Sequence, residues 1–143
     1  MTGASYDPAA ASHRALRTVR HELGRHPAVV TARGFPSGEH TRVVADLAPD
    51  RLGITAEGAT VTVRWFAGEQ PDSEPEFSVH YSDGQRDFGW HHEPNPHVDG
   101  MGHFQRRTDP ESDYSYEPYQ FASKQPARVV WEVLSALSAE IES

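Results

Sequence analysis

The densest group of chemically active side chains lies in a segment that begins at His80 and ends at Arg107. Five of the nine histidines fall in this segment, which reads WHHEPNPHVDGMGHFQRR from Trp90 onward. Imidazole groups can transfer protons near neutral pH, bind Zn²⁺ or a similar metal ion, or donate hydrogen bonds to a phosphate beside arginines. The candidate catalytic residues are His97, His103, His91, His80 and Asp87. The candidate phosphate-binding residues are Arg106 and Arg107.

A β-hairpin is predicted to bring His80 and Asp87 together. Apolar and polar residues alternate on both sides of Asp83 and Gly84, which suit a two-residue turn. With that turn, His80 lies directly opposite Asp87, and the apolar residues of both strands share the other face. The two side chains could form an acid–base pair or half of a metal site. The alternative is an exposed cross-strand ion pair that contributes little to stability.

The histidines after this hairpin are predicted to lie in an irregular loop that contains prolines and glycines. A rigid sheet often carries functional groups on such a loop. The spacings of 5 and 6 residues between His92, His97 and His103 match no established metal-binding motif. The chain has no cysteine, so a metal ion would need His, Asp or Glu ligands. We therefore expect no cofactor, with a Zn or Ni ion as the alternative. The histidines could also be structural and form hydrogen bonds with the polar groups of a buried loop.

A basic stripe is predicted on the first helix. Arg14, Arg17, His21 and Arg25 follow one another at spacings of 3, 4 and 4 residues, which places them on one helical face. This stripe could contact a phosphate backbone or an acidic partner protein. An ordinary solvated helix face has the same pattern.

The elements that position these groups follow from hydrophobic spacing and turn residues. Asp7 and Pro8 begin a helix over 8–24, and the apolar spacing after Pro126 predicts a second helix. Between them lie short β-branched or aromatic runs separated by Gly and Pro. The predicted strands are 28–32, 41–47, 60–66, the two arms of the 76–92 hairpin, and a tyrosine-rich segment near 114–119. The predicted fold is α+β: an antiparallel sheet of about six strands with one N-terminal and one C-terminal helix.

Composition limits the classes of function. A chain of 143 residues suits a single domain, 1–143. No run of apolar residues is long enough to cross a membrane, and the cysteine-free sequence excludes disulfides, so we expect a cytoplasmic protein. The net charge of -8 opposes non-specific binding to nucleic acid. Lys124 is the single lysine, and this arginine bias with surplus carboxylates suits a salt-rich cytoplasm.

Part of the chain resembles the TumE-like small toxin–antitoxin family. Trp90 matches that family's tryptophan, Pro96 and His97 match its proline–histidine step, and His103 matches its later histidine cluster. The similarity covers about residues 77–105, and Val98 stands where the family has a second histidine. The resemblance implies a toxin component with a cognate antitoxin protein and RNA cleavage as its activity.

Three functions remain open on the sequence. In a metal-independent ribonuclease, His97 or His103 would take the proton of the RNA 2′-hydroxyl group, and Arg106 or Arg107 would stabilise the phosphorane. In a binding or regulatory module for a protein or nucleic acid, the histidines would be structural. In a metal-dependent hydrolase, His80, Asp87 and His91 would hold the ion. The partners to expect are RNA, an antitoxin or, through Trp131, a second copy of the chain, but not a membrane.

Overall fold

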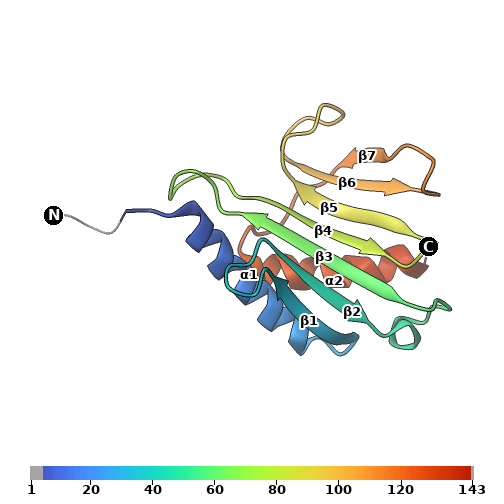
Figure 1. Cartoon of the computed structure of the whole chain (residues 1–143). Coiled ribbons are helices and arrows are strands. Elements are labelled where there is room, and N and C mark those ends of the chain that lie inside the picture. Colours follow the sequence, from blue (N-terminus) through green and yellow to red (C-terminus); the bar gives the residue numbers. More distant parts are fainter. Residues whose placement is uncertain (1–4, 143) are drawn as a thin grey trace.

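The computed structural model describes residues 5–142, which form a sheet between an N-terminal and a C-terminal helix (Figure 1). The elements in chain order are α1 (Pro8–Arg25), β1 (Val29–Phe35), β2 (Arg42–Leu47), the short 3-10 helix η1 (Pro49–Leu52), β3 (Ala59–Phe66), β4 (Glu76–Ser82), β5 (Asp87–His92), β6 (Gly102–Arg107), β7 (Ser115–Pro118) and α2 (Pro126–Glu142). The structure confirms the α+β prediction. The sheet has seven strands instead of about six, because the segment that forms β6 was predicted to be loop.

The seven strands form an antiparallel meander in which each strand pairs with its neighbours in sequence. Both helices lie on the same face of the sheet and pack against each other (Figure 1). The opposite face is covered by neither helix, and we call it the open face. Its side chains are therefore available for contacts other than those of the core.

The helix α1 begins where the sequence predicts. The carboxylate of Asp7 accepts hydrogen bonds from the backbone N–H groups of Ala9 and Ala10, at 3.0 and 3.4 Å. These bonds satisfy donors that lack a partner in the first turn of a helix. The predicted apolar stripe of Leu16, Val19 and Leu23 is buried. The polar side of α1 is left exposed.

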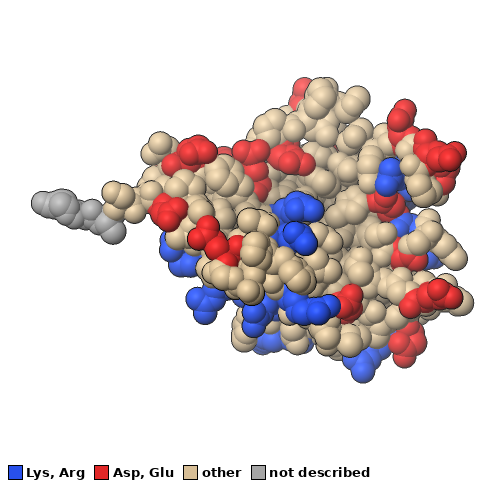
Figure 2. All heavy atoms as spheres, viewed as in Figure 1, with Lys and Arg blue, Asp and Glu red and all other residues tan. Residues whose placement is uncertain are grey.

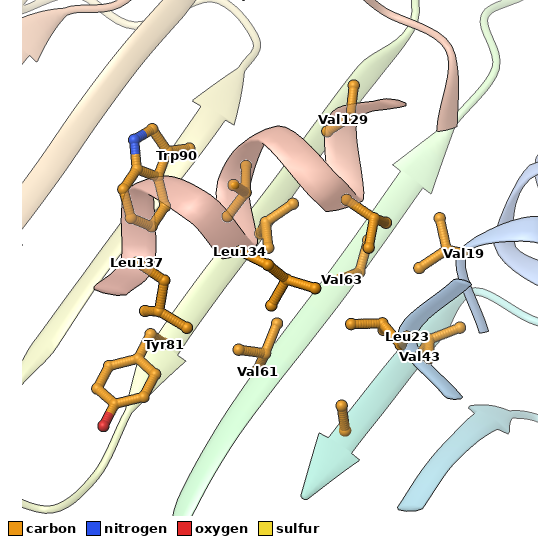
Figure 3. Close-up of a cluster of buried hydrophobic side chains, with 14 of the residues drawn as sticks. Val19, Leu23, Val43, Val61, Val63, Tyr81, Trp90, Val129, Leu134 and Leu137 are labelled. Carbon is orange, nitrogen blue, oxygen red and sulfur yellow. The ribbon is translucent and has the colours of Figure 1, made fainter. Parts of the chain in front are cut away.

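The core lies between the helices and the sheet (Figure 3). Leu134 and Leu137 of α2 pack toward the sheet residues Val61, Tyr81 and Trp90. Each such buried side chain contributes about 1.5–3 kcal/mol to stability. Successive side chains of a strand point to opposite faces. Since the apolar residues face the helices, the polar residues that alternate with them lie on the open face.

The pairing of β4 with β5 corrects the register predicted from sequence. Ser82 pairs with Asp87, and His80 pairs with Gly89, so the strands are shifted by two residues from the prediction. Residues 83–86 form a four-residue loop instead of a two-residue turn. The predicted contact between His80 and Asp87 still forms, but as a diagonal contact across the strands.

Asp83 explains the longer loop. Its carboxylate accepts hydrogen bonds from the backbone N–H groups of Gln85 and Arg86, at 2.9 and 2.7 Å. It also accepts one from the Tyr81 hydroxyl, at 2.8 Å. Because these bonds fix the loop backbone to a buried carboxylate, the four-residue loop is more stable here than the tighter turn.

Trp131 lies at the edge of the contact between the two helices. Its indole N–H donates to Glu22 at 2.8 Å, and its ring lies 5.4 Å from that of His26. The side chain is 37% exposed. Its position is thus explained within one chain and gives no support to a dimer contact. Within residues 5–142, neither helix has the length and hydrophobicity needed to span a membrane.

Candidate functional site on the open sheet face

Polar side chains from β4 to β7 meet on the open face because the strand register aligns them in rows. One row runs from Ser78 through His91 to His103, and the next runs from His80 through Gly89 to Gln105. The structure therefore brings together four of the predicted catalytic residues. These are His80, Asp87, His91 and His103.

Asp87 is the centre of a hydrogen-bonded network on this face. His80 Nε2 bonds to one carboxylate oxygen of Asp87, and Arg107 Nε donates to the other at 2.6 Å. The Tyr114 hydroxyl lies 3.0 and 3.1 Å from the two oxygens. Burial alone would raise the pKa of Asp87, but the hydrogen bonds from His80, Arg107 and Tyr114 outweigh it and hold the pKa below its usual value. The carboxylate is therefore ionised at neutral pH.

Gly89 leaves room for the His80 ring. The two residues are direct partners across β4 and β5, and a Cβ atom at Gly89 would lie 2.5 Å from His80 Nδ1. Any larger residue would push the ring away from Asp87. A glycine at this strand position thus lets the imidazole lie flat across the sheet toward its carboxylate partner.

The protonation of His80 suits a general base. Burial lowers the pKa of His80 from its usual value, although the hydrogen bond to Asp87 and its charge act in the opposite direction. The ring is therefore neutral at pH 7. Its side chain is 25% exposed, so it can be reached from solvent. A neutral imidazole oriented by a carboxylate is an arrangement that can accept a proton from a hydroxyl group.

His91 and His103 form a second, more deeply buried pair. Their rings stack with centroids 5.1 Å apart, and His91 Nδ1 donates to Glu93 at 2.9 Å. Two ring nitrogens, His91 Nε2 and His103 Nδ1, are buried and have no hydrogen-bond partner of ordinary geometry within residues 5–142. Burial, and then the neighbouring His91, lowers the pKa of His103. Contacts with Met101 and Gln105 and the charge of Glu93 act in the opposite direction and offset this only in part.

Three side chains at this pair are of types that can bind a metal ion. Among the described residues, His91, Glu93 and His103 each offer one ligand atom within 4.8 Å of the others. Zn²⁺ binds ligand nitrogens at about 2.0–2.1 Å, and both histidines carry a buried ring nitrogen with no hydrogen-bond partner among residues 5–142. The alternative of a metal-dependent site therefore rests on His91, Glu93 and His103.

The remaining residues of the predicted loop are separated from His80. His97 is exposed in the loop between β5 and β6, and its ring stacks on Tyr116 at 4.6 Å. His91 and His103 lie in strands, which corrects the prediction that the histidines after Trp90 occupy one loop. That prediction failed because β6, a short and polar strand, pairs across a long loop and lacks the apolar alternation of its neighbours.

The two predicted phosphate-binding arginines point to opposite faces. Arg107 lies on the open face beside Asp87 and over the Tyr114 ring, 4.8 Å from its centre. Arg106 lies on the helix-covered face, where it pairs with Glu140 of α2 and covers the rings of Phe88 and Phe104. The structure therefore does not bring Arg106 to the histidines.

The basic stripe of α1 is also separated from the histidines of the open face, His80, His91 and His103. It lies on a helix that packs against the covered face, and its four side chains are exposed, as the helical spacing predicts. Within the stripe, Arg25 forms an ion pair with Glu22 at 3.3 Å. The stripe members are Arg14, Arg17, His21 and Arg25.

Three residues of the site were not singled out from the sequence. The sequence places Tyr114 only in the tyrosine-rich segment, Glu93 only in the predicted loop, and Gly89 only within a predicted strand. The alternation of tyrosines before Pro118 could have placed Tyr114 on one sheet face. Its carboxylate partner could not be foreseen, because the pairing of β6 with β7 decides it.

Comparisons with known proteins give no relative from which to assign a role. No protein-family model, curated protein or solved structure matches this chain. The site geometry on the open face is thus the basis for a functional assignment.

Proposed function

We propose that the protein cleaves RNA with His80 as the general base and without a metal ion. The observation that supports this most directly is the contact between His80 and Asp87 on the open face. His80 is partly exposed, its pKa is lowered, and a carboxylate orients its ring. Those are the properties required of a base that works near neutral pH.

The proposed reaction is an internal transesterification. His80 takes the proton of the RNA 2′-hydroxyl group, whose oxygen attacks the adjacent phosphorus atom. The bond between phosphorus and the 5′-oxygen then breaks, and that oxygen receives a proton from an acid. The products are a 2′,3′-cyclic phosphate and a 5′-hydroxyl group, so no oxidant, reductant or additional reactant is needed.

Arg107 and Tyr114 would supply the other two roles. The Arg107 guanidinium group is held beside the base by Asp87 and can stabilise the negative charge that develops on the phosphorane. Burial, and then Asp87, raises the pKa of Tyr114, so its hydroxyl keeps its proton at neutral pH. Tyr114 is therefore our candidate for the acid that protonates the leaving oxygen.

These roles differ from those expected from the sequence. His103 is 0% exposed and cannot contact a substrate in this arrangement. His97 is exposed, but its ring stacks on Tyr116 and has no carboxylate partner within residues 5–142. We therefore assign the base to His80, and we leave His91 and His103 as buried polar groups beneath the site.

The test is cleavage of end-labelled RNA by the purified protein, with and without EDTA. His80→Gln should lose activity about 10²–10⁴-fold. His26→Gln, a substitution at a histidine beyond the end of α1, should leave it unchanged. Products carrying 2′,3′-cyclic phosphate would support the mechanism. EDTA-sensitive cleavage would contradict it in favour of a metal-dependent hydrolase, and no cleavage would favour a binding module.

The resemblance to TumE-like toxins adds an expected partner to this proposal. An antitoxin could bind the exposed basic stripe of α1, since that stripe lies away from His80 and its positive charge suits an acidic protein. Co-expression with the product of the neighbouring gene should give a complex. Substitution of Arg14 and Arg17 by Glu should weaken that complex, whereas a complex that forms equally well would exclude this surface.

A further inference from the structure

We infer that the β1–β3 half of the open face binds single-stranded RNA, with Arg42 and Arg64 holding successive phosphates of the strand. Both arginines project from the same face as His80, because their neighbours Val43 and Val63 are buried under the helices. The choice of RNA as the ligand depends on the proposed function. The binding surface itself is argued from the charges and rings of this half of the sheet.

The register connects these arginines directly to the histidines. Arg42 pairs with Arg64, and Arg64 pairs with Ser78 of β4. Ser78 in turn pairs with His91, so one row of side chains crosses the sheet at right angles to the strands. Neighbouring strands lie about 4.8 Å apart. Arg64 is thus one strand away from His80, close enough for both to contact one bound strand.

The cross-strand pair of arginines is costly in the absence of an anion. Two like charges directly opposite each other on a sheet destabilise it. Neither Arg42 nor Arg64 forms an ion pair with a carboxylate within residues 5–142. Arg33, in the adjacent row, lies 3.8 Å from Asp46, but both side chains are largely exposed. An electrostatic cost of this kind is explained if the pair neutralises a ligand of repeated negative charge.

Aromatic rings accompany the arginines. The Phe35 ring has the Arg42 guanidinium group over it at 5.1 Å and that of Arg33 at 6.0 Å. Phe66, at the end of β3 and on the same face, is 36% exposed. Phe35 is half-buried beneath these guanidinium groups, so Phe66, whose strand partner is Glu76, is the exposed ring on this half of the sheet. An exposed ring beside cationic side chains can stack an unpaired base while the cations hold phosphates. A double helix would keep its bases away from such rings, so the ligand is single-stranded.

The charge distribution separates this surface from the rest of the acidic protein. In Figure 2, some Lys and Arg atoms lie in the middle of the view over the sheet and others lie at the lower left over α1, whereas Asp and Glu atoms lie along the upper and right margins and at the left. The net charge of -8 repels nucleic acid elsewhere. Binding is therefore confined to the basic part of the face and depends on salt.

The experiment measures binding of a fluorescent 2′-O-methyl RNA oligonucleotide, which has no 2′-hydroxyl group to attack phosphorus and so is not cleaved. Anisotropy titrations at several salt concentrations compare wild type with R42Q/R64Q. The matched control, R20Q/R128Q, removes two exposed arginines from the helices. For R42Q/R64Q we expect the dissociation constant to rise roughly 10- to 100-fold. Its salt slope should fall by about 1.4, the value for two phosphate contacts with a single strand.

Each outcome bears on one proposal at a time. Arginine-dependent binding by a protein that cleaves no RNA would keep this inference and reject the ribonuclease. Equal affinity of wild type and R42Q/R64Q would overturn the inference, even if RNA is cleaved. A preference for duplex RNA, or equally tight binding of polyglutamate, would also overturn it. Thermal unfolding of R42Q/R64Q should occur at the wild-type temperature or above, because the like-charge pair is gone.

Discussion

Two groups of histidines lie side by side on the open face, and they differ in exposure and in hydrogen bonding. His80 is partly exposed, and its partner Asp87 accepts hydrogen bonds from three side chains. His91 and His103 are more deeply buried, and each keeps one ring nitrogen that has no hydrogen-bond partner in the described part of the chain. The two groups are nevertheless close, since the ring centroids of His80 and His91 lie 5.8 Å apart. Proximity alone therefore does not give histidines the same role.

The difference in exposure and hydrogen bonding indicates which histidine can exchange a proton with a substrate. A side chain that exchanges a proton with a substrate must be reachable and must be held in one orientation, as His80 is. A buried nitrogen without a partner costs stability. His91 and His103 thus contribute a polar layer beneath the site at some energetic cost, while His80 is the base in our proposal. Four predictions test that division.

The largest effect is expected for Asp87→Asn. The neutral amide has one oxygen instead of two, so it cannot accept hydrogen bonds from both His80 and Arg107. The imidazole of His80 then loses its orientation. We expect RNA cleavage to fall about 10²–10⁴-fold. Single-turnover cleavage rates measure this, with Asp72→Asn in the exposed β3–β4 loop as the control. An active Asp87→Asn enzyme would contradict the assignment of the base to His80.

Gly89→Ala should have the next largest effect. The new Cβ atom would lie 2.5 Å from His80 Nδ1 and 2.9 Å from the Val79 carbonyl oxygen, so both the ring and the strand must shift. We expect a destabilisation of about 1–3 kcal/mol and a loss of cleavage that persists at temperatures where the variant is folded. Urea unfolding and cleavage assays give the two quantities. Gly38→Ala, where no atom lies within 4 Å of the new Cβ, is the matched control.

His103→Leu should change the free energy of unfolding only slightly, and in the opposite direction to Gly89→Ala. The leucine removes the buried Nδ1 atom, which has no hydrogen-bond partner within residues 5–142, together with the 3.4 Å contact between His103 Nε2 and Asn95, and it keeps a side chain of similar volume. The free energy of unfolding should stay unchanged or rise by about 1 kcal/mol, and cleavage should continue. Loss of activity in a well-folded variant would show that the division between the two histidine groups is wrong.

The smallest effect is a change in how stability depends on pH. The pKa of His103 and that of His80 are lower in the folded protein than the ordinary value of 6.5. Below that value the unfolded chain binds more protons than the folded one, so the free energy of unfolding must decrease as pH falls. Urea unfolding between about pH 7 and pH 5 should show this decrease. The decrease should be smaller for His103→Leu. If the variant and the wild type have the same pH profile, burial of His103 does not cause the decrease.

Much of the fold could be predicted from local patterns. The apolar spacing of Leu16, Val19 and Leu23 identified α1, and β-branched runs identified three of the strands. The strand β6 was not predicted, because its residues GHFQRR have little apolar alternation. It forms because the flanking strands β5 and β7 supply its backbone hydrogen bonds. Short polar strands of this kind are decided by tertiary pairing, not by their own sequence.

The candidate site could be predicted only in part. The pairing of His80 with Asp87 was expected from a turn that proved to be two residues longer, and the contact survives because His80 reaches Asp87 diagonally over Gly89. The separation of Arg106 from Arg107 follows from strand alternation once β6 is known. Burial of His103 depends on what covers it from neighbouring elements, and a single sequence does not give that information.

The meander described above also shapes how the chain must fold. Every strand pairs with a strand next to it in sequence, so the sheet is built entirely from local hairpins of low contact order. The contacts of the helices have a longer range: the Ala67 N–H donates to Ser12, 55 positions away, and the indole of Trp131 donates to Glu22, 109 positions away. Docking of α2 beside α1 is therefore the step that closes the longest loop. Until it occurs, part of the apolar sheet face stays in water, so the core is complete only when the 17 residues of α2 have docked.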